Sequence, residues 1–278
     1  MGASGGGAPG GEGTYAERLD WRRAWETVRS GEALGTIGRA SLVVGYLSRR
    51  LVPGALAIRF PLGRRVYIRR RTFNSDFEAF RGVFLPRRNA YQGNYRGVAV
   101  LDIGAHKGYF GAYALLNGAR RVVSYEPEPS NFALLERGAR SFRQQGASWQ
   151  ARASAVAGRS GRAMLHVSGE SWTHSLGRLP RDGAARQVGE VGVEVVGIAE
   201  ALSDMAGYEP VVMKIDAEGS ECDIVDALTA ELVPGVRVVL IEAHDFADCS
   251  AGELSSAMAR LGFSAHATVD PEVIRFER

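Results

Sequence analysis

A glycine turn between carboxylates is the first stretch of this sequence whose residue types and spacing point to ligand chemistry. Residues 98–126 read as a buried strand, a turn of the form Asp102-x-Gly104-x-x-x-Gly108, a helix and a second strand that ends at Glu126. The glycines let the backbone approach a ligand without a side-chain clash. Glu126 follows Gly108 by 126 − 108 = 18 residues, a spacing typical of an acid that accepts hydrogen bonds from ribose hydroxyls. Because ligands of open α/β sheets bind at the carboxyl ends of the strands, this unit predicts a nucleoside site.

The same turn lacks the pattern of a dinucleotide site. Such a site has the form Gly-x-Gly-x-x-Gly, with the third glycine inside the helix, and that pattern is absent here. The carboxylate of Asp102, just before the turn, would also repel a pyrophosphate. The turn therefore favours a nucleoside ligand without a pyrophosphate.

Five ionisable side chains follow two predicted buried strands at residues 211–215 and 236–241: Asp216, Glu218, Glu221, Glu242 and His244. Charges in such places are costly to desolvate unless they are paired, hydrogen-bonded or bound to a ligand. His244 is a candidate general base, because an imidazole titrates near neutral pH. Asp216 with Glu242 could instead hold a divalent ion such as Mg²⁺ that polarises a hydroxyl group. A purely structural interpretation pairs Lys214 with Glu218.

The elements that must position these residues alternate between strand and helix along most of the chain. The 278 residues and their 45% hydrophobic content are enough for one large α/β domain. Hydrophobic periodicity predicts further helices at residues 127–142, 198–205, 222–228 and 254–261, and further strands at residues 149–156, 162–167, 192–196, 263–268 and 273–276. A loop between residues 169 and 189 lacks periodicity; its Trp172, His174 and Ser175 are candidate substrate contacts, although such residues are more often loop packing.

The first 97 residues differ in composition from the rest. Residues 1–13 are rich in glycine, and we expect a disordered tail. Residues 14–97 predict an extension that caps the site, with helices at residues 15–29, 37–51 and 74–85 and a hairpin made of residues 55–60 and 65–68. Twelve arginines lie between Ile37 and Tyr95, against two acids, Asp76 and Glu78.

This basic segment could meet a phosphate, an acidic carrier protein or an anionic membrane surface, or it could be a solvated face without a partner. The aromatic and basic interleaving of a nucleic-acid module is not visible, so nucleic acid is not an expected partner.

The two cysteines, Cys222 and Cys249, have no metal-ligand spacing and indicate no disulfide framework, and we interpret them as inert thiols. Free thiols suit a reducing compartment, which predicts a cytoplasmic protein. The sequence has no apolar run long enough to span a bilayer, and its start lacks a charged-then-apolar signal pattern.

Four runs of this sequence resemble the FkbM family of S-adenosylmethionine-dependent methyltransferases. The resemblance covers about Asp76 to His244, and its motifs occur in the order of the family: VLDIGAHKGYFGAYAL, VVSYEPEPSNFALLE, VVMKIDAEGSECDIVDAL and LIEAH. By resemblance the turn would surround the methionine moiety, Glu126 would bind the ribose, and Ser154 with Ala155 would contact the edge of the adenine. The cofactor-binding residues so implied are Asp102, Gly104, Ala105, His106, Gly108, Glu126, Pro127, Ser154, Ala155 and Asp216. His106 stands where many relatives have asparagine.

The resemblance also implies a fold and a reaction. We expect a Rossmann-like α/β domain over residues 98–278, with a seven-strand, mainly parallel sheet. Asp216, Glu218 and His244 are the catalytic candidates, because their cluster would face the methyl group and the acceptor hydroxyl. The expected reaction is O-methylation of a small molecule, a sugar or a secondary metabolite, and the basic segment leaves room for a glycosylated, phosphorylated or carrier-bound acceptor. The alternatives are an NAD-dependent oxidoreductase, which shares Glu126 and the strand-turn-helix unit, and a non-catalytic nucleoside-binding module of the same fold.

Overall fold

The structure, a computed structural model, describes residues 35–48, 53–85, 88–171, 173–177, 186–244 and 249–278. The predicted tail at residues 1–13 and the predicted helix at residues 15–29 lie outside the described residues. Trp172 of the irregular loop lies outside them as well.

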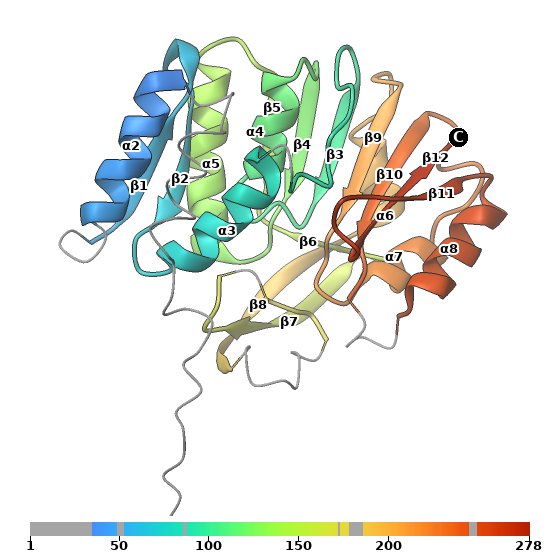
Figure 1. Ribbon diagram of the computed structural model, residues 1–278. Coiled ribbons are helices and arrows are strands. Elements are labelled where there is room, and N and C mark those ends of the chain that lie inside the picture. Colours follow the sequence, from blue (N-terminus) through green and yellow to red (C-terminus); the bar gives the residue numbers. More distant parts are fainter. Residues whose placement is uncertain (1–34, 49–52, 86–87, 172, 178–185, 245–248) are drawn as a thin grey trace, which may run out of the picture.

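Seven strands form the central sheet, in the order β11-β12-β10-β9-β3-β4-β5 (Figure 1). They are β3 (Ala99–Ile103), β4 (Arg121–Tyr125), β5 (Trp149–Arg152), β9 (Val211–Ile215), β10 (Val236–Glu242), β11 (Ser264–Ala267) and β12 (Val273–Glu277). Neighbours from β10 to β5 pair in parallel, whereas β12 runs antiparallel to both of its neighbours. Every residue of β3 and β9 is buried, as in a sheet covered on both faces. The predicted seven-strand, mainly parallel sheet is confirmed.

Helices cover both faces of this sheet. They are α4 (Tyr109–Leu116) and α5 (Pro129–Arg143) on one face, and α6 (Ile198–Ser203), α7 (Glu221–Asp226) and α8 (Ala251–Arg260) on the other. Successive residues of a strand point to opposite faces. Accordingly, Val100 and Val122 pack with the α4 and α5 side, while Leu101 and Val123 pack with the α6, α7 and α8 side.

The basic extension packs against α5 at the end of the molecule opposite to β11 (Figure 1). Its elements are α2 (Gly35–Ser48), β1 (Ala55–Arg59), the short 3-10 helix η3 (Pro61–Gly63), β2 (Arg65–Arg69) and α3 (Phe73–Phe84), in good agreement with the predicted hairpin and helices. The backbone N–H of Arg65 donates to Ser141 Oγ of α5 at 2.9 Å. In α3, Phe80 stacks on Phe84 with ring centroids 4.6 Å apart and meets the ring of Tyr109 edge-on. The extension and the sheet therefore share one hydrophobic core.

A second, small sheet lies across the carboxyl ends of the central strands (Figure 1). It contains β6 (Ala155–Ala157), β8 (Gln187–Gly197) and β7 (Gly161–Ser168), in that order. The sequence predicts a single strand at residues 149–156, but the structure divides it. The chain bends at residues 153–154, so that β5 pairs with β4 in the central sheet and β6 pairs with β8.

Cys222 and Cys249 form a disulfide, so the prediction of two free thiols is wrong. The bond joins the first turn of α7 to the residue that precedes the Ser250 cap of α8. The two cysteines meet because α7 and α8 pack side by side, a contact that no local pattern encodes. The expectation of a reducing compartment, which rested on free thiols, loses that basis. Within the described ranges, none of the helices has the length and apolar character that a membrane span requires.

Removing this disulfide should lower the free energy of unfolding. The bond closes a loop across a sequence separation of 27 residues, and freeing a loop of that length costs about 3 kcal/mol through the entropy of the unfolded chain. We expect this loss in C222S/C249S, measured by urea unfolding. Reductant should destabilise the wild type and leave the variant unchanged; equal unfolding midpoints for oxidised and reduced wild type would contradict the prediction.

Candidate active site

A cavity of about 1020 Å³ opens at the carboxyl ends of β3, β4, β9 and β10. Its wall includes residues at each of these strand ends, among them Ile103, Tyr125, Asp216 and Glu242. The small sheet contributes Ala155, Val156 and Leu165, and the extension contributes Glu78 and Tyr91. The cavity thus lies where the strand-turn-helix unit predicts a ligand.

The glycine turn brings two strand ends into contact. Gly104 has a φ of +72°, and a Cβ built on it would lie 1.6 Å from the carbonyl oxygen of Asp216. No side chain fits in that space, so Gly104 is needed for the backbones that follow β3 and β9 to meet. Gly108 has a different role, because a Cβ there would lie 2.6 Å from Leu135 Cδ1 of α5. It allows α4 to begin in close contact with its neighbour.

Glu126 lies at the end of the cavity beside Gly104 and Ala105, where the sequence resemblance predicts the methyl donor; we call this the donor end. Its Oε2 accepts the backbone N–H of His106 at 2.7 Å, and its Oε1 accepts the backbone N–H of Glu128 at 2.9 Å. Burial raises the pKa of Glu126 to about 8, although both N–H groups act in the opposite direction. Each carboxylate oxygen keeps a second lone pair for a ligand hydroxyl. The residue therefore has the geometry of a ribose acceptor.

Three of the predicted cofactor residues do not line the cavity: Asp102, Gly108 and Ser154. Asp102 is fully buried, accepts from Ser124 Oγ at 3.0 Å, and lies with Oδ1 3.8 Å from Lys214 Nζ. It stands behind the turn rather than in the wall. The other predicted cofactor residues line the cavity: Gly104, Ala105, His106, Glu126, Pro127, Ala155 and Asp216.

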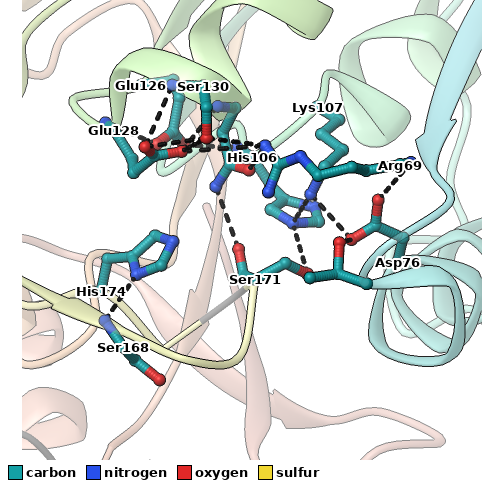
Figure 2. Close-up of polar contacts among 12 residues, drawn as sticks. Arg69, Asp76, His106, Lys107, Glu126, Glu128, Ser130, Ser168, Ser171 and His174 are labelled. Atoms are coloured by element: carbon teal, nitrogen blue, oxygen red, sulfur yellow. Dashed lines mark hydrogen bonds and ion pairs between the residues drawn. The ribbon is translucent and has the colours of Figure 1, made fainter. Parts of the chain in front are cut away.

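A buried polar chain connects the turn to the extension. Lys107 Nζ lies 2.9 Å from Asp76 Oδ1 of α3 and 2.6 Å from His106 Nε2, and Figure 2 shows it between the two. Burial lowers the pKa of Lys107 to about 8. The nearby carboxylate of Asp76 raises this pKa, but its effect is smaller than that of burial. Burial and the Lys107 charge hold the pKa of His106 well below its usual value, so the imidazole is neutral.

The end of the cavity beyond β9 and β10, which we call the acceptor end, is lined by charged side chains. Two of them, Lys214 and His244, are cations. Lys214 Nζ lies 2.8 Å from Asp216 Oδ2, and His244 Nδ1 lies 3.0 Å from Glu221 Oε1. His244 Nε2 is 3.6 Å from Glu218 Oε2. Burial alone would lower the pKa of His244, but the hydrogen bond to Glu221 and the surrounding carboxylates raise it to about 10. The imidazole is therefore protonated at neutral pH and cannot accept a proton there.

Among the described residues, the pair predicted to hold a divalent ion, Asp216 and Glu242, is engaged with other groups of the chain. Asp216, Glu218 and His244 place one ligand atom each within 4.8 Å of one another. The ammonium of Lys214 already neutralises Asp216, and the imidazole of His244 carries a proton. Glu242, the other predicted ligand, accepts the hydroxyl of Tyr91 at 2.7 Å instead. Because these groups already have partners within the chain, we derive no step through a metal.

Sequence reasoning missed Tyr91 and Lys214 as cavity residues. Tyr91 comes from the segment between α3 and β3, where no motif marks it, and reaches Glu242 across 151 positions of sequence. Lys214 is the residue of β9 just before the strand end, a place that could have identified it. His174, named only as a loop candidate, does line the cavity.

The order of the seven strands, with the cavity at their carboxyl ends, defines a Rossmann-like methyltransferase fold. The sequence from residue 102 to residue 265 matches the methyltransferase FkbM domain. That match covers more than half of the chain, and the protein belongs to this family of methyltransferases. The methyl donor that this assignment supports is S-adenosylmethionine.

Solved structures of methyltransferases are similar to this chain at low sequence identity. A methyltransferase FkbM from Methylobacillus flagellatus is 15% identical, with a TM-score of 0.44, and the comparison covers 92% of this chain and 58% of that protein. This chain therefore spans less than two thirds of that protein's length. A magnesium protoporphyrin IX methyltransferase from Synechocystis, solved with bound S-adenosylmethionine, is 12% identical, with a TM-score of 0.38 over 92% of this chain and 90% of that one. A search of the curated proteins found no match.

Protonation of His244 should make stability depend on pH. The folded protein keeps this proton up to a pH of about 10, whereas an unperturbed histidine releases it near pH 6.5. The contribution is complete below pH 6.5, and the free energy of unfolding should fall as pH rises from there to about 10. We expect this fall to be smaller in H244Q, measured by urea unfolding at several pH values. The lowered pKa of Lys107 and the raised pKa of Glu126 act in both proteins and cancel in the comparison. The difference then reports His244 together with Glu218 and Glu242, because the charge of His244 lowers the pKa of both carboxyls. Identical pH dependences would contradict the assignment.

Proposed function

We propose that the protein is an S-adenosylmethionine-dependent O-methyltransferase that modifies a hydroxyl group of a small molecule, a sugar or a secondary metabolite. The observation that carries this proposal is one continuous cavity with Glu126 at one end and Glu242 at the other. Glu126 would accept hydrogen bonds from the ribose hydroxyls, and Glu242 would take a proton from the hydroxyl group of the acceptor. The family assignment supports methyl transfer, and the two ends supply its donor and acceptor sites.

The donor end would hold S-adenosylmethionine through the turn at Gly104 and Ala105 and the carboxylate of Glu126. Ala155 and Pro127, which line the same end, would contact the nucleoside. When bound, the cofactor supplies a methyl group on a positively charged sulfur. The chain contributes by holding the donor and the acceptor in line, which accounts for most of the rate in such a displacement.

Among the ionisable residues at the acceptor end, Glu242 is best placed to take the proton from the acceptor hydroxyl. Asp216 is held by Lys214, and His244 is already protonated. Burial holds the pKa of Glu218, a predicted catalytic residue, well above its usual value. Glu242 lines the cavity and is oriented by the Tyr91 hydroxyl. Burial and the neighbouring Asp216 carboxylate raise its pKa to about 7, where a general base is effective. We therefore assign the role of base to a carboxylate rather than to the imidazole of His244.

The charge of the acceptor end supports an uncharged acceptor. Asp216, Glu218, Glu242, Asp270 and Glu272 line this part of the cavity. A phosphorylated group would be repelled there, whereas sugar hydroxyls can donate to carboxylates. Arg88 of the extension lines the cavity, and it pairs with Glu78 at 3.5 Å. These features favour a neutral polyhydroxy compound.

Replacing the ribose carboxylate should weaken cofactor binding. In E126Q one hydrogen-bond acceptor becomes a donor that faces a backbone N–H, so we expect S-adenosylhomocysteine to bind less tightly by roughly 1 to 3 kcal/mol. Isothermal titration calorimetry measures this without knowledge of the acceptor. An unchanged dissociation constant would refute the ribose role, and stabilisation of the wild type by NAD but not by S-adenosylhomocysteine would refute the methyltransferase proposal.

Replacing the proposed base should slow catalysis and spare binding. We expect E242Q to lower kcat by about 10²- to 10⁴-fold, the usual contribution of proton transfer, while the dissociation constant of S-adenosylhomocysteine stays within twofold. The assay is transfer of labelled methyl groups to a panel of sugars and polyols. Full activity of E242Q would remove Glu242 from the mechanism. No transfer by the wild type to any hydroxyl compound would favour a non-catalytic binding module.

A further inference from the structure

Helix α2 exposes an apolar face in a segment whose only charged residues are arginines. We propose that this face and the arginines around it bind the protein peripherally to a bilayer of anionic lipids. The α2 surface, as we call it, consists of Val44 and Leu47 of α2 together with Arg59, Arg70 and Arg71 of the hairpin region. The inference does not rest on the proposed function, because no residue of the α2 surface lines the cavity.

Only one side of α2 packs against the rest of the described chain. Leu42 is buried in the core that the extension shares with the sheet, and Tyr46 packs against the same core. On the other side Val44 and Leu47 are 60% and 64% exposed, and α2 is the outermost element at this end of the molecule (Figure 1). Arg39 is the only charged residue among the 14 of the helix. Because a helix that is apolar on all sides is normally buried, the outer face of α2 is suited to an apolar partner.

The segment that contains α2 carries positive charge only. Residues 33–75 include no aspartate, glutamate or lysine and nine arginines, which are Arg39, Arg49, Arg50, Arg59, Arg64, Arg65, Arg69, Arg70 and Arg71. Two of these arginines lie next to the exposed last turn of α2. Arg70 donates from Nη1 to Ser48 Oγ at 3.0 Å, at the final residue of the helix, and the side chain of Arg71 is exposed. The apolar face of α2 is therefore bordered by cations that no acid of the same segment neutralises.

The hairpin of β1 and β2, on which α2 packs, adds to this charge. Arg59 and Arg65 are opposite each other in its register, and neither strand contains an acid. Like charges directly opposite on a sheet repel each other, and anionic head groups would offset this repulsion. At the turn between the strands, Leu62 is 69% exposed. Val44, Leu47 and Leu62 are three of the seven large apolar side chains that are exposed among the described residues, so apolar surface and positive charge are concentrated in the same segment.

The two features together favour a lipid surface over other anionic partners. Anionic head groups attract arginines, and the boundary of the acyl chains accepts aliphatic side chains such as Val44 and Leu47. A nucleic acid offers negative charge, but its bases stack on aromatic side chains, and the exposed large apolar residues of this segment are aliphatic. A second copy of the chain would bring the same arginines together, which is unfavourable.

Flotation of the full chain with lipid vesicles tests the inference. We compare vesicles of equal parts of phosphatidylglycerol and phosphatidylcholine with vesicles of phosphatidylcholine alone. We expect the protein to float with the anionic vesicles only, and NaCl at about 0.5 M to lower the bound fraction, because salt screens the attraction of the arginines to the head groups. Equal flotation with both kinds of vesicle, or flotation with neither, would overturn the inference.

The apolar contribution is measured with V44S/L47S. We expect this variant to lower the partition coefficient for anionic vesicles about tenfold or more, because two aliphatic side chains are lost from the bilayer. V188S is the matched control, since Val188 of β8 is 64% exposed, as Leu47 is, and lies away from the extension; its partition coefficient should stay within twofold of the wild type. Dimers of the wild type that V44S/L47S disperses, seen by light scattering without vesicles, would assign the face to a second copy and overturn the inference.

The charged contribution is measured with R59Q/R71Q, which changes two exposed arginines. We expect the partition coefficient for anionic vesicles to fall about tenfold, and R159Q/R162Q, two exposed arginines outside the extension, to leave it within twofold. Binding that R59Q/R71Q weakens and V44S/L47S leaves unchanged would indicate a purely charged partner, such as an acidic protein or RNA, and would overturn the inference.

A labelled protein keeps the inference testable even if V44S/L47S fails to fold. L47C carries an environment-sensitive dye, attached without reductant so that the bond between Cys222 and Cys249 stays intact. Its emission should shift to the blue on anionic vesicles, because the dye enters an apolar layer, whereas the same dye on V188C should not shift. The same spectrum with and without vesicles at position 47, or equal shifts at both positions, would overturn the inference.

Discussion

The buried ion pair between Lys107 and Asp76 is the constraint on which the cavity depends. Both side chains are fully buried, and removing one partner of such a pair costs about 3–5 kcal/mol, because the other charge remains bare. Lys107 belongs to the cofactor turn and Asp76 to α3 of the extension. Any arrangement that separates these two elements would break the pair. The pair therefore helps to hold the extension against the cofactor turn, together with the hydrophobic core that the two share.

The two ends of the cavity satisfy their charges in opposite ways. At the donor end the buried Glu126 accepts two backbone N–H groups, and burial still raises its pKa to about 8. At the acceptor end, carboxylates outnumber the two cations, Lys214 and His244. The first arrangement keeps lone pairs for neutral hydroxyls. The second leaves negative charge close to a site where a proton has to be removed, and disfavours the approach of an anionic acceptor.

Local sequence patterns were enough to predict most strands of the central sheet and the glycine turn, whereas the seven-strand sheet as a whole was expected from the family resemblance. The run from Ala99 to Glu126 encodes strand, turn, helix and strand within 28 residues, and the structure follows it almost residue by residue. The acid clusters after β9 and β10 were also predicted to meet, because parallel strands end at the same edge of a sheet.

Contacts between distant segments could not be predicted in this way. The disulfide depends on the packing of α7 against α8, and the contact of Tyr91 with Glu242 depends on how the extension packs against the central sheet. His244 was correctly placed at the cavity, but its protonation follows from Glu221 and Glu218, whose distances from the ring only the folded chain defines. The sequence identified these ionisable groups, whereas their charge states came from the neighbours that folding provides.

The shared core of the extension and the sheet limits how this protein can change. Phe80 and Phe84 pack among residues of α4 and α5, so cutting the chain before β3 would leave a sheet domain with an uncovered apolar face. The segment that supplies Tyr91 to the acceptor end is therefore not an exchangeable module. A shift in acceptor preference during evolution would have to come from point substitutions in the wall, since swapping the N-terminal segment with that of a relative would cost the stability of the whole fold.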